Sequence, residues 1–252
     1  MNKASIKLKY IDVLDEEGTF YFKKAMKIFA VVFKEDKFYI KTIKQILKRK
    51  LHPVNTIFRI LIAIDKEKQL VLGVCIYRHW IDINRTTLEY IMTRPKLTGC
   101  GIGTLLYRKL KTDLKAMGSK GLFFSCAGDV DLEKYQYMTD EYRKNNRLRV
   151  KFYENLGARP LLGLRYNSPL CWWFKKDVYC YPNFCYDPLS FKKIKHRVRV
   201  QSKLVTEIIK RIMLTYYGFH PSNHKVKNIL NSITTKQLEW RPARYSKETI
   251  RG

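Results

Sequence analysis

The chain has no long hydrophobic run. Its longest apolar stretch, IFRILIAI at residues 57–64, is interrupted by Arg59 and falls far short of the roughly 20 residues that a membrane-spanning helix needs. The first 18 residues, MNKASIKLKYIDVLDEEG, lack the apolar core of a secretory signal. We therefore expect a soluble, cytoplasmic protein with no transmembrane segment.

Cysteine pairs are also missing. The six cysteines form neither a CxxC pair nor a dense framework, so they predict free thiols in a reducing compartment rather than structural disulfides. Cys180 and Cys185 could be combined with His196, but this spacing fits no common zinc-ligand pattern. We expect no metal.

Acidic residues are few. The chain has 22 Asp and Glu against 50 Lys and Arg, which gives a formal net charge of +28. Such a balance favours a nucleic acid, an anionic membrane surface or a phosphate-rich ligand as partner. The abundance of Lys, Ile and Asn also fits compositional drift in an A+T-rich genome, and both interpretations stay open.

Periodicity in the sequence predicts an α+β protein. Alternating or compact apolar runs indicate strands, and apolar residues three to four positions apart indicate helices. The expected strands are 6–13, 56–64, 70–80, 87–93 and 122–126, and the expected helices are 20–33, 38–50, 104–117 and 140–156, followed by a β-rich stretch at 158–175. Short polar turns between residues 56 and 93 predict an antiparallel meander.

The composition of the sequence changes near residue 177. Residues 175–252 hold 17 Lys and Arg against 5 Asp and Glu, and a helical apolar stripe follows the loop-like segment CYPNFCYDPLS. The stretch 193–201 also alternates in the manner of a strand. We expect one domain at 1–176 and a basic, largely helical C-terminal extension at 177–252.

Three of the twelve glycines lie within GCGIG, residues 99–103, between a predicted strand and a predicted helix. A Walker loop would need Lys after its second glycine, but Thr104 and Leu105 follow Gly103. A dinucleotide fingerprint would need an acidic residue about 20 positions on, and residues 120–126 contain none. The remaining interpretation is a pyrophosphate cradle made of main-chain N–H groups at a helix N-terminus. A glycine turn that serves only tight packing is the simpler alternative.

Two motifs resemble the GNAT superfamily of N-acetyltransferases. LEYIMTRPKLTGCGIGTLLYRKL, residues 88–110, is similar to the acyl-CoA-binding signature, with Gly101 and Gly103 at its two glycine positions. NNRLRVKFYENLGARP, residues 145–160, is similar to a second motif that pairs an Asn with a Tyr seven residues later, here Asn146 and Tyr153. The resemblance spans about residues 5–174. It implies a central, mostly antiparallel sheet flanked by helices.

The resemblance implies roles for particular residues. Glu89 would act as general base through water, or alternatively hold substrate or face solvent, and Tyr153 would act as general acid on the departing thiolate. Acetyl-CoA, as co-substrate, would contact the strand and the cradle through Ile91, Met92, Thr93, Thr98, Gly99, Cys100, Gly101, Ile102, Gly103, Thr104 and Asn146. Thr98 departs from the usual Arg or Gln, and Cys100 replaces a usual basic residue, so Lys96 or Arg108 would support binding.

Two functions from different classes follow. The first is an acetyl-CoA-dependent N-acyltransferase that acts on an amine acceptor of unknown identity, either a small molecule or a protein, by direct transfer. The second is a binding module for nucleic acid or another polyanion, in which Tyr216, Tyr217, Phe219 and Trp240 of the extension would stack on bases. A third possibility is that the extension covers a sheet edge or forms a homo-oligomer interface.

Overall fold

The computed structural model describes residues 5–48, 55–126, 140–166, 183–190 and 198–240. The chain divides into two units, Met1–Leu122 and Phe123–Gly252. The first unit holds the glycine motif, and the second holds Asn146, Tyr153 and the basic C-terminal segment.

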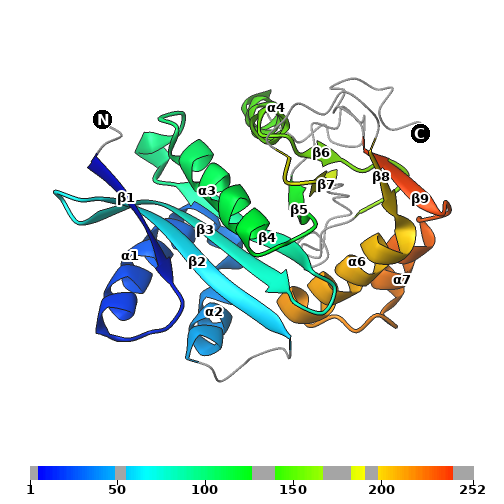
Figure 1. The fold of residues 1–252 in the computed structure, drawn as a ribbon, viewed down its shortest axis with the longest axis horizontal. Helices are drawn as coiled ribbons and strands as arrows, with labels where there is room; N and C mark the ends of the chain where they lie inside the picture. The colour runs from blue at the N-terminus through cyan, green and yellow to red at the C-terminus, as the bar shows by residue number, and fades with distance from the viewer. Residues whose placement is uncertain (1–4, 49–54, 127–139, 167–182, 191–197, 241–252) are drawn as a thin grey trace. The chain divides into compact units, whose positions relative to one another are not determined.

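Four antiparallel strands form the sheet of the first unit. They are β1 (Ile6–Ile11), β2 (Thr56–Asp65), β3 (Leu70–Trp80) and β4 (Arg85–Thr93), and each pairs with the next along the chain. The predicted meander is therefore confirmed. Nearly every residue of β3 is buried, because the strand lies between two others and carries helices on both faces (Figure 1).

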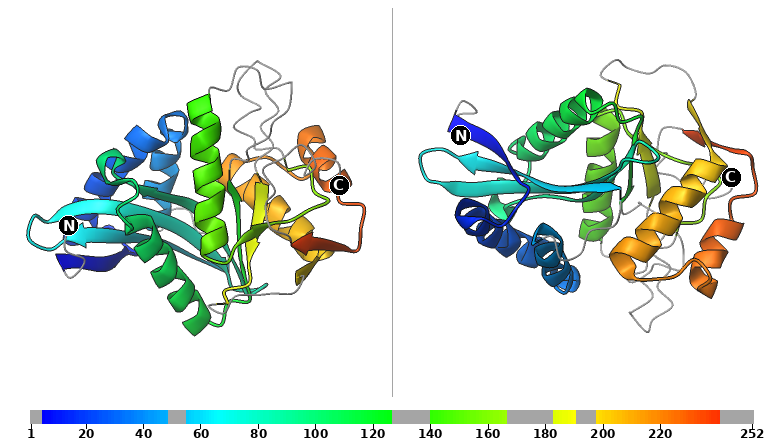
Figure 2. Two further views of the ribbon diagram at one scale, coloured as in Figure 1. Left: turned by 90° about the horizontal axis from the view of Figure 1, so that it is seen from above. Right: turned by 60° about the horizontal axis from the view of Figure 1, so that its bottom comes forward.

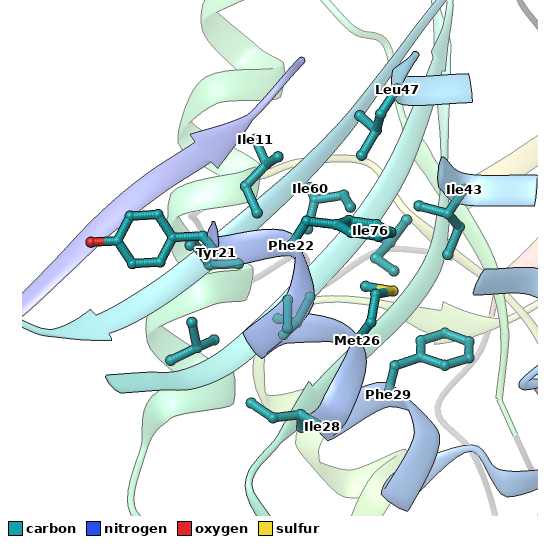
Figure 3. Packing of buried hydrophobic residues seen from close by; sticks show 14 of the residues in the cluster. Ile11, Tyr21, Phe22, Met26, Ile28, Phe29, Ile43, Leu47, Ile60 and Ile76 are labelled. Carbon is teal, nitrogen blue, oxygen red and sulfur yellow. The ribbon is translucent and has the colours of Figure 1, made fainter. Parts of the chain in front are cut away.

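Two helices cover one face of this sheet (Figures 1 and 2). Helix α1 (Glu16–Val32) begins four residues before the predicted start because the Asp15 carboxylate accepts a hydrogen bond from the Gly18 N–H. A 3₁₀ turn, η2 (Lys34–Asp36), joins it to α2 (Tyr39–Leu47). Apolar side chains of both helices pack against β2 and β3 in one buried cluster, as Figure 3 shows for Phe22, Met26, Phe29, Ile43, Ile60 and Ile76.

Helix α3 (Ile102–Ala116) covers the opposite face (Figures 1 and 2). Ile102, Leu106, Leu110 and Leu114 are buried and recur at helical spacing, so they form the inner face of the helix. A 3₁₀ turn, η3 (Pro95–Leu97), and the glycine motif connect β4 to this helix. The connection therefore runs from the edge of the meander directly to the N-terminus of a buried helix.

The second unit contains β5 (Leu122–Cys126), which begins at the boundary, and α4 (Asp140–Asn155), both close to their predicted ranges. The short strand β6 (Arg159–Pro160) pairs antiparallel with β7 (Asn183–Asp187), and the strand order is β5-β7-β6. The prediction of a loop over CYPNFCYDPLS was wrong for residues 183–187. Residues 167–175 of the predicted β-rich stretch lie outside the described residues.

The C-terminal segment contains β8 (Val198–Gln201), α6 (Ser202–Tyr217), α7 (His224–Asn231) and β9 (Gln237–Trp240), and β8 pairs with β9. Leu161 forms a β-bridge with Trp240, and the Leu162 N–H donates to the Glu239 carbonyl at 2.9 Å. The segment thus pairs with the chain directly after β6. The expected domain boundary at residues 176 and 177 falls outside the described residues.

Candidate functional site

The glycine motif forms an exposed turn that only glycine adopts readily. Gly99 has φ 85° and Gly101 has φ 83°, both in the left-handed region where a side chain would be strained. Thr98, Gly99 and Cys100 are exposed, and a Cβ on Gly99 would meet no atom within 4 Å. The backbone therefore lies open to a ligand, and it is not packed against another element there.

Several main-chain N–H groups lie close together where this turn leads into α3. The Leu105 N–H donates to the Gly101 carbonyl at 3.0 Å, which places Gly101 at the N-cap. The N–H groups of residues 101–104 precede the first bond within the helix, and none donates to a main-chain carbonyl of the described chain. Four donors at the positive end of a helix dipole can bind a diphosphate. Binding of a diphosphate by these donors stays a prediction.

Gly73 on β3 sets how closely the cradle approaches the sheet. A Cβ on Gly73 would lie 2.7 Å from Cγ2 of Ile102 and 3.0 Å from both Cδ1 of Leu106 and the carbonyl oxygen of Met92. The first turn of α3 therefore sits directly on the backbone of β3. The sequence interpretation did not include Gly73, although a glycine inside a buried strand indicates such a close approach.

Basic side chains flank the turn in two different ways. Arg94 donates from Nε to the Val71 carbonyl at 2.6 Å, and its N–H donates to the Leu72 carbonyl at 2.9 Å, so it ties the end of β4 to β3. Lys96 and Arg108 are exposed. Their predicted support of phosphate binding, in place of a longer residue at position 98, stays a prediction.

Strand β4 carries a β-bulge before it reaches the cradle. Ile76 is paired with Tyr90 and Tyr77 is paired with Leu88, so Glu89 is an extra residue on β4. Further along the strand, Met92 is buried, whereas Ile91 and Thr93 are partly exposed. A bulge redirects the main chain locally and is a common device beside functional sites.

The side chain of Glu89 is enclosed. Its side chain and that of Arg78 are both 0% exposed, and Oε1 of Glu89 lies 3.1 Å from Nε of Arg78. Oε2 of Glu89 accepts a hydrogen bond from the Tyr39 hydroxyl at 2.8 Å. The carboxylate thus has a cation and a hydroxyl as partners. The sequence interpretation missed both, although an arginine inside the apolar strand VLGVCIYRHW was a visible signal.

The motif residues of the second unit lie on α4. Asn146 is 1% exposed and Tyr153 is 7% exposed. The Tyr153 ring lies 4.4 Å from that of Phe124 and 5.0 Å from that of Phe152, measured between centroids. Tyr153 therefore packs against aromatic side chains. Its role as general acid, and any joint action with residues of the first unit, stays a prediction.

His79 and Trp240 are both buried and have hydrogen-bond partners within the protein. Nδ1 of His79 lies 3.0 Å from Oγ1 of Thr86, and burial lowers the pKa of His79, which favours the neutral ring. Trp240 is 4% exposed and donates from Nε1 to the Tyr186 carbonyl at 2.9 Å, so its expected stacking on nucleic-acid bases was wrong.

Within the described ranges, no group of His, Cys, Asp or Glu could hold a metal, and no helix could span a membrane.

No protein-family model and no curated protein sequence matches the chain. Solved structures do match it. A GNAT-family protein from Bacteroides thetaiotaomicron superposes with a TM-score of 0.54 at 15% identity, covering 83% of this chain and 98% of its own. A GCN5-related N-acetyltransferase from Kribbella flavida gives a TM-score of 0.48 at 12% identity, covering 74% and 99%. The element order, the mostly antiparallel sheet flanked by helices and the first of these superpositions together show that the chain has the fold of the GNAT superfamily.

Proposed function

We propose that the protein is an N-acyltransferase that moves an acetyl group from acetyl-CoA to a primary amine by direct transfer. The observation that carries this proposal is the open glycine turn, whose N–H groups converge at the N-terminus of α3. An anionic diphosphate fits such a site because the donors are preoriented and no Cβ obstructs the approach at Gly99. Acetyl-CoA would supply the activated thioester.

The bulged strand supports the same proposal. Acyl transfer places negative charge on the thioester oxygen, and oriented main-chain N–H groups stabilise such charge well. The end of β4 from Ile91 to Thr93, where Ile91 and Thr93 are partly exposed and Met92 is buried, precedes the cradle in the chain and is paired with β3. We assign it contact with the pantetheine arm and with the carbonyl.

The amine and the thiolate also need proton transfers. A primary amine with a pKa near 10.4 is present mainly as the ammonium ion at neutral pH, so the reacting neutral fraction rises with pH. The enclosed Glu89 carboxylate is a poor fit to a base that exchanges protons with water. Tyr153 is the residue we assign to protonate the thiolate, which has an ordinary pKa of about 8.5.

Ligand-dependent stability tests the proposal without knowledge of the acceptor. Acetyl-CoA and free CoA are each expected to raise the Tm in a concentration-dependent manner, because a ligand that binds only the folded chain stabilises it. A panel of amines then identifies turnover through release of free thiol. If neither form of the cofactor changes the Tm, the proposal fails at its first step.

The polyanion-binding alternative has its own test. Lys203, Lys227 and Lys236 of the C-terminal segment are exposed, whereas Trp240 is buried. Charge reversal at Lys203 and Lys227 tests this alternative more cleanly than deletion of the C-terminal segment would. Such a deletion would also remove β7 and β9, which form part of the strand pairing of the second unit. Retention on a polyanion column that is unaffected by these substitutions counts against this alternative.

A further inference from the structure

At the β4 bulge, Glu89 has an exposed backbone and a buried side chain. The residue as a whole is partly exposed, yet its side chain is 0% exposed. The accessible surface therefore belongs to the main chain. The carboxylate points into the protein, while main-chain atoms of Glu89 are accessible, on the strand that leads to the cradle.

Three elements meet at this carboxylate. Arg78 comes from β3, Tyr39 from the start of α2, and Glu89 from the bulge. The guanidinium carbon of Arg78 lies 5.0 Å from the Phe58 ring centroid and 5.7 Å from that of Trp80. Arg78 is thus held between aromatic rings while its Nε faces Glu89. We call Arg78, Glu89 and Tyr39 the bulge anchor.

The bulge also turns the next side chain to the same side. Successive side chains of a regular strand point to opposite faces. Tyr90 nevertheless packs with the helices of the Glu89 side, its ring lying 4.7 Å from Phe29, 4.8 Å from Phe33 and 5.9 Å from Tyr39. One hydrogen bond from Tyr39 and three ring contacts, from Phe29, Phe33 and Tyr39, therefore hold two consecutive residues of β4 and fix the bend between them.

The charge of the buried Glu89 carboxylate explains how the bulge anchor can set the bend of β4. A buried carboxylate that loses its cation must be protonated or turn outward to water. Turning Glu89 outward would require its main chain to rotate, because Glu89 is itself the extra residue at which the register between β3 and β4 shifts. The position of Arg78 is thereby coupled to the direction of the main chain at Glu89.

We propose that the bulge anchor positions the main chain of β4 against the thioester carbonyl, and that Glu89 is a positioning residue and not the general base. This inference rests on the proposed function, since it concerns the same bound thioester. It differs from the role that the sequence resemblance implied for Glu89. It also identifies Arg78 and Tyr39 as determinants of activity.

The test uses acetyl-CoA labelled with ¹³C at the carbonyl, because its chemical shift reports polarisation by hydrogen bonds. The double variant Arg78→Met/Glu89→Met removes both charges together and so leaves no unpaired ion in the core. We expect wild-type protein to move the bound carbonyl resonance downfield, and the double variant to lose that displacement while its Kd for free CoA stays within about threefold. Tyr39→Phe is expected to reduce the displacement partially, with the fold intact.

Glu89→Gln separates positioning from base catalysis. Glutamine keeps the shape and an acceptor oxygen for Arg78, so positioning predicts a kcat within about tenfold of wild type and an unchanged pH profile. Loss of a general base predicts a fall of about 10² to 10⁴ and loss of its ionisation from the profile.

The outcomes are distinct. If wild-type protein does not bind CoA, the proposed function fails. If it binds CoA, but the double variant and Tyr39→Phe both keep the full carbonyl displacement, or Glu89→Gln loses the ionisation, the inference is overturned.

Discussion

The bulge and the cradle lie in the same unit but are built in opposite ways. At the bulge, buried side chains from three elements hold a partly accessible backbone. At the cradle, the backbone itself is exposed, and two left-handed glycines and the dense contact between Gly73 and Ile102 set its shape. The bulge should therefore be sensitive to its charged side chains, whereas the cradle should tolerate departures such as Thr98 and Cys100.

The largest effect is expected at the bulge anchor. Arg78→Met alone leaves the Glu89 carboxylate buried without its cation and should lower the free energy of unfolding by about 3–5 kcal/mol. The double variant Arg78→Met/Glu89→Met should recover much of that loss. Urea denaturation of the four proteins in this cycle measures the coupling. Additive losses would show that the two residues do not act as a pair.

A smaller effect is expected beneath the cradle. Gly73→Ala forces a Cβ against Ile102 and should reduce the free energy of unfolding by about 1–3 kcal/mol, as overpacked cores do. It should also weaken CoA binding, because the first turn of α3 must shift. Combining it with Ile102→Ala removes the colliding methyl group, so the double variant should lose less than the sum of the single changes. Titration with CoA would contradict this account if Gly73→Ala bound it with unchanged Kd.

The matched pair Gly101→Ala and Gly118→Ala separates strain from ligand contact. Both glycines have positive φ, at 83° and 74°, at opposite ends of α3. Each substitution should cost about 1–2 kcal/mol of stability through left-handed strain. Only Gly101→Ala is expected to weaken CoA binding, which calorimetry measures. Equal loss of affinity in both variants would indicate general destabilisation and not a cradle.

Much of the fold could be predicted from the sequence where local signals agreed with tertiary packing. Strands β2 and β3 and helix α3 have clear periodicity, and the glycine motif marked a site at a strand–helix junction. Helix α1 began earlier than predicted because Asp15 caps it, and β7 was missed because its five residues are defined by pairing with β6.

The bulge anchor could not be predicted, for a physical reason. Which face Glu89 occupies depends on the register between β3 and β4, and that register shifts by one residue at Ile76 and Tyr77. A single slipped position reverses the direction of every later side chain. The position of Arg78 within an apolar strand can be read from the sequence. That Glu89 is its partner depends on the register shift between β3 and β4, which no local sequence pattern indicates.

Cys100 provides the most direct test of the central claim, that the glycine turn binds CoA. It is the exposed thiol within the turn, whereas Cys75, Cys126 and Cys185 are buried and burial raises the pKa of Cys185 well above its usual range. Alkylation by iodoacetamide, followed for each cysteine by mass spectrometry, should slow strongly at Cys100 when CoA saturates the protein. Unchanged alkylation of Cys100 at a CoA concentration that saturates binding would contradict the account.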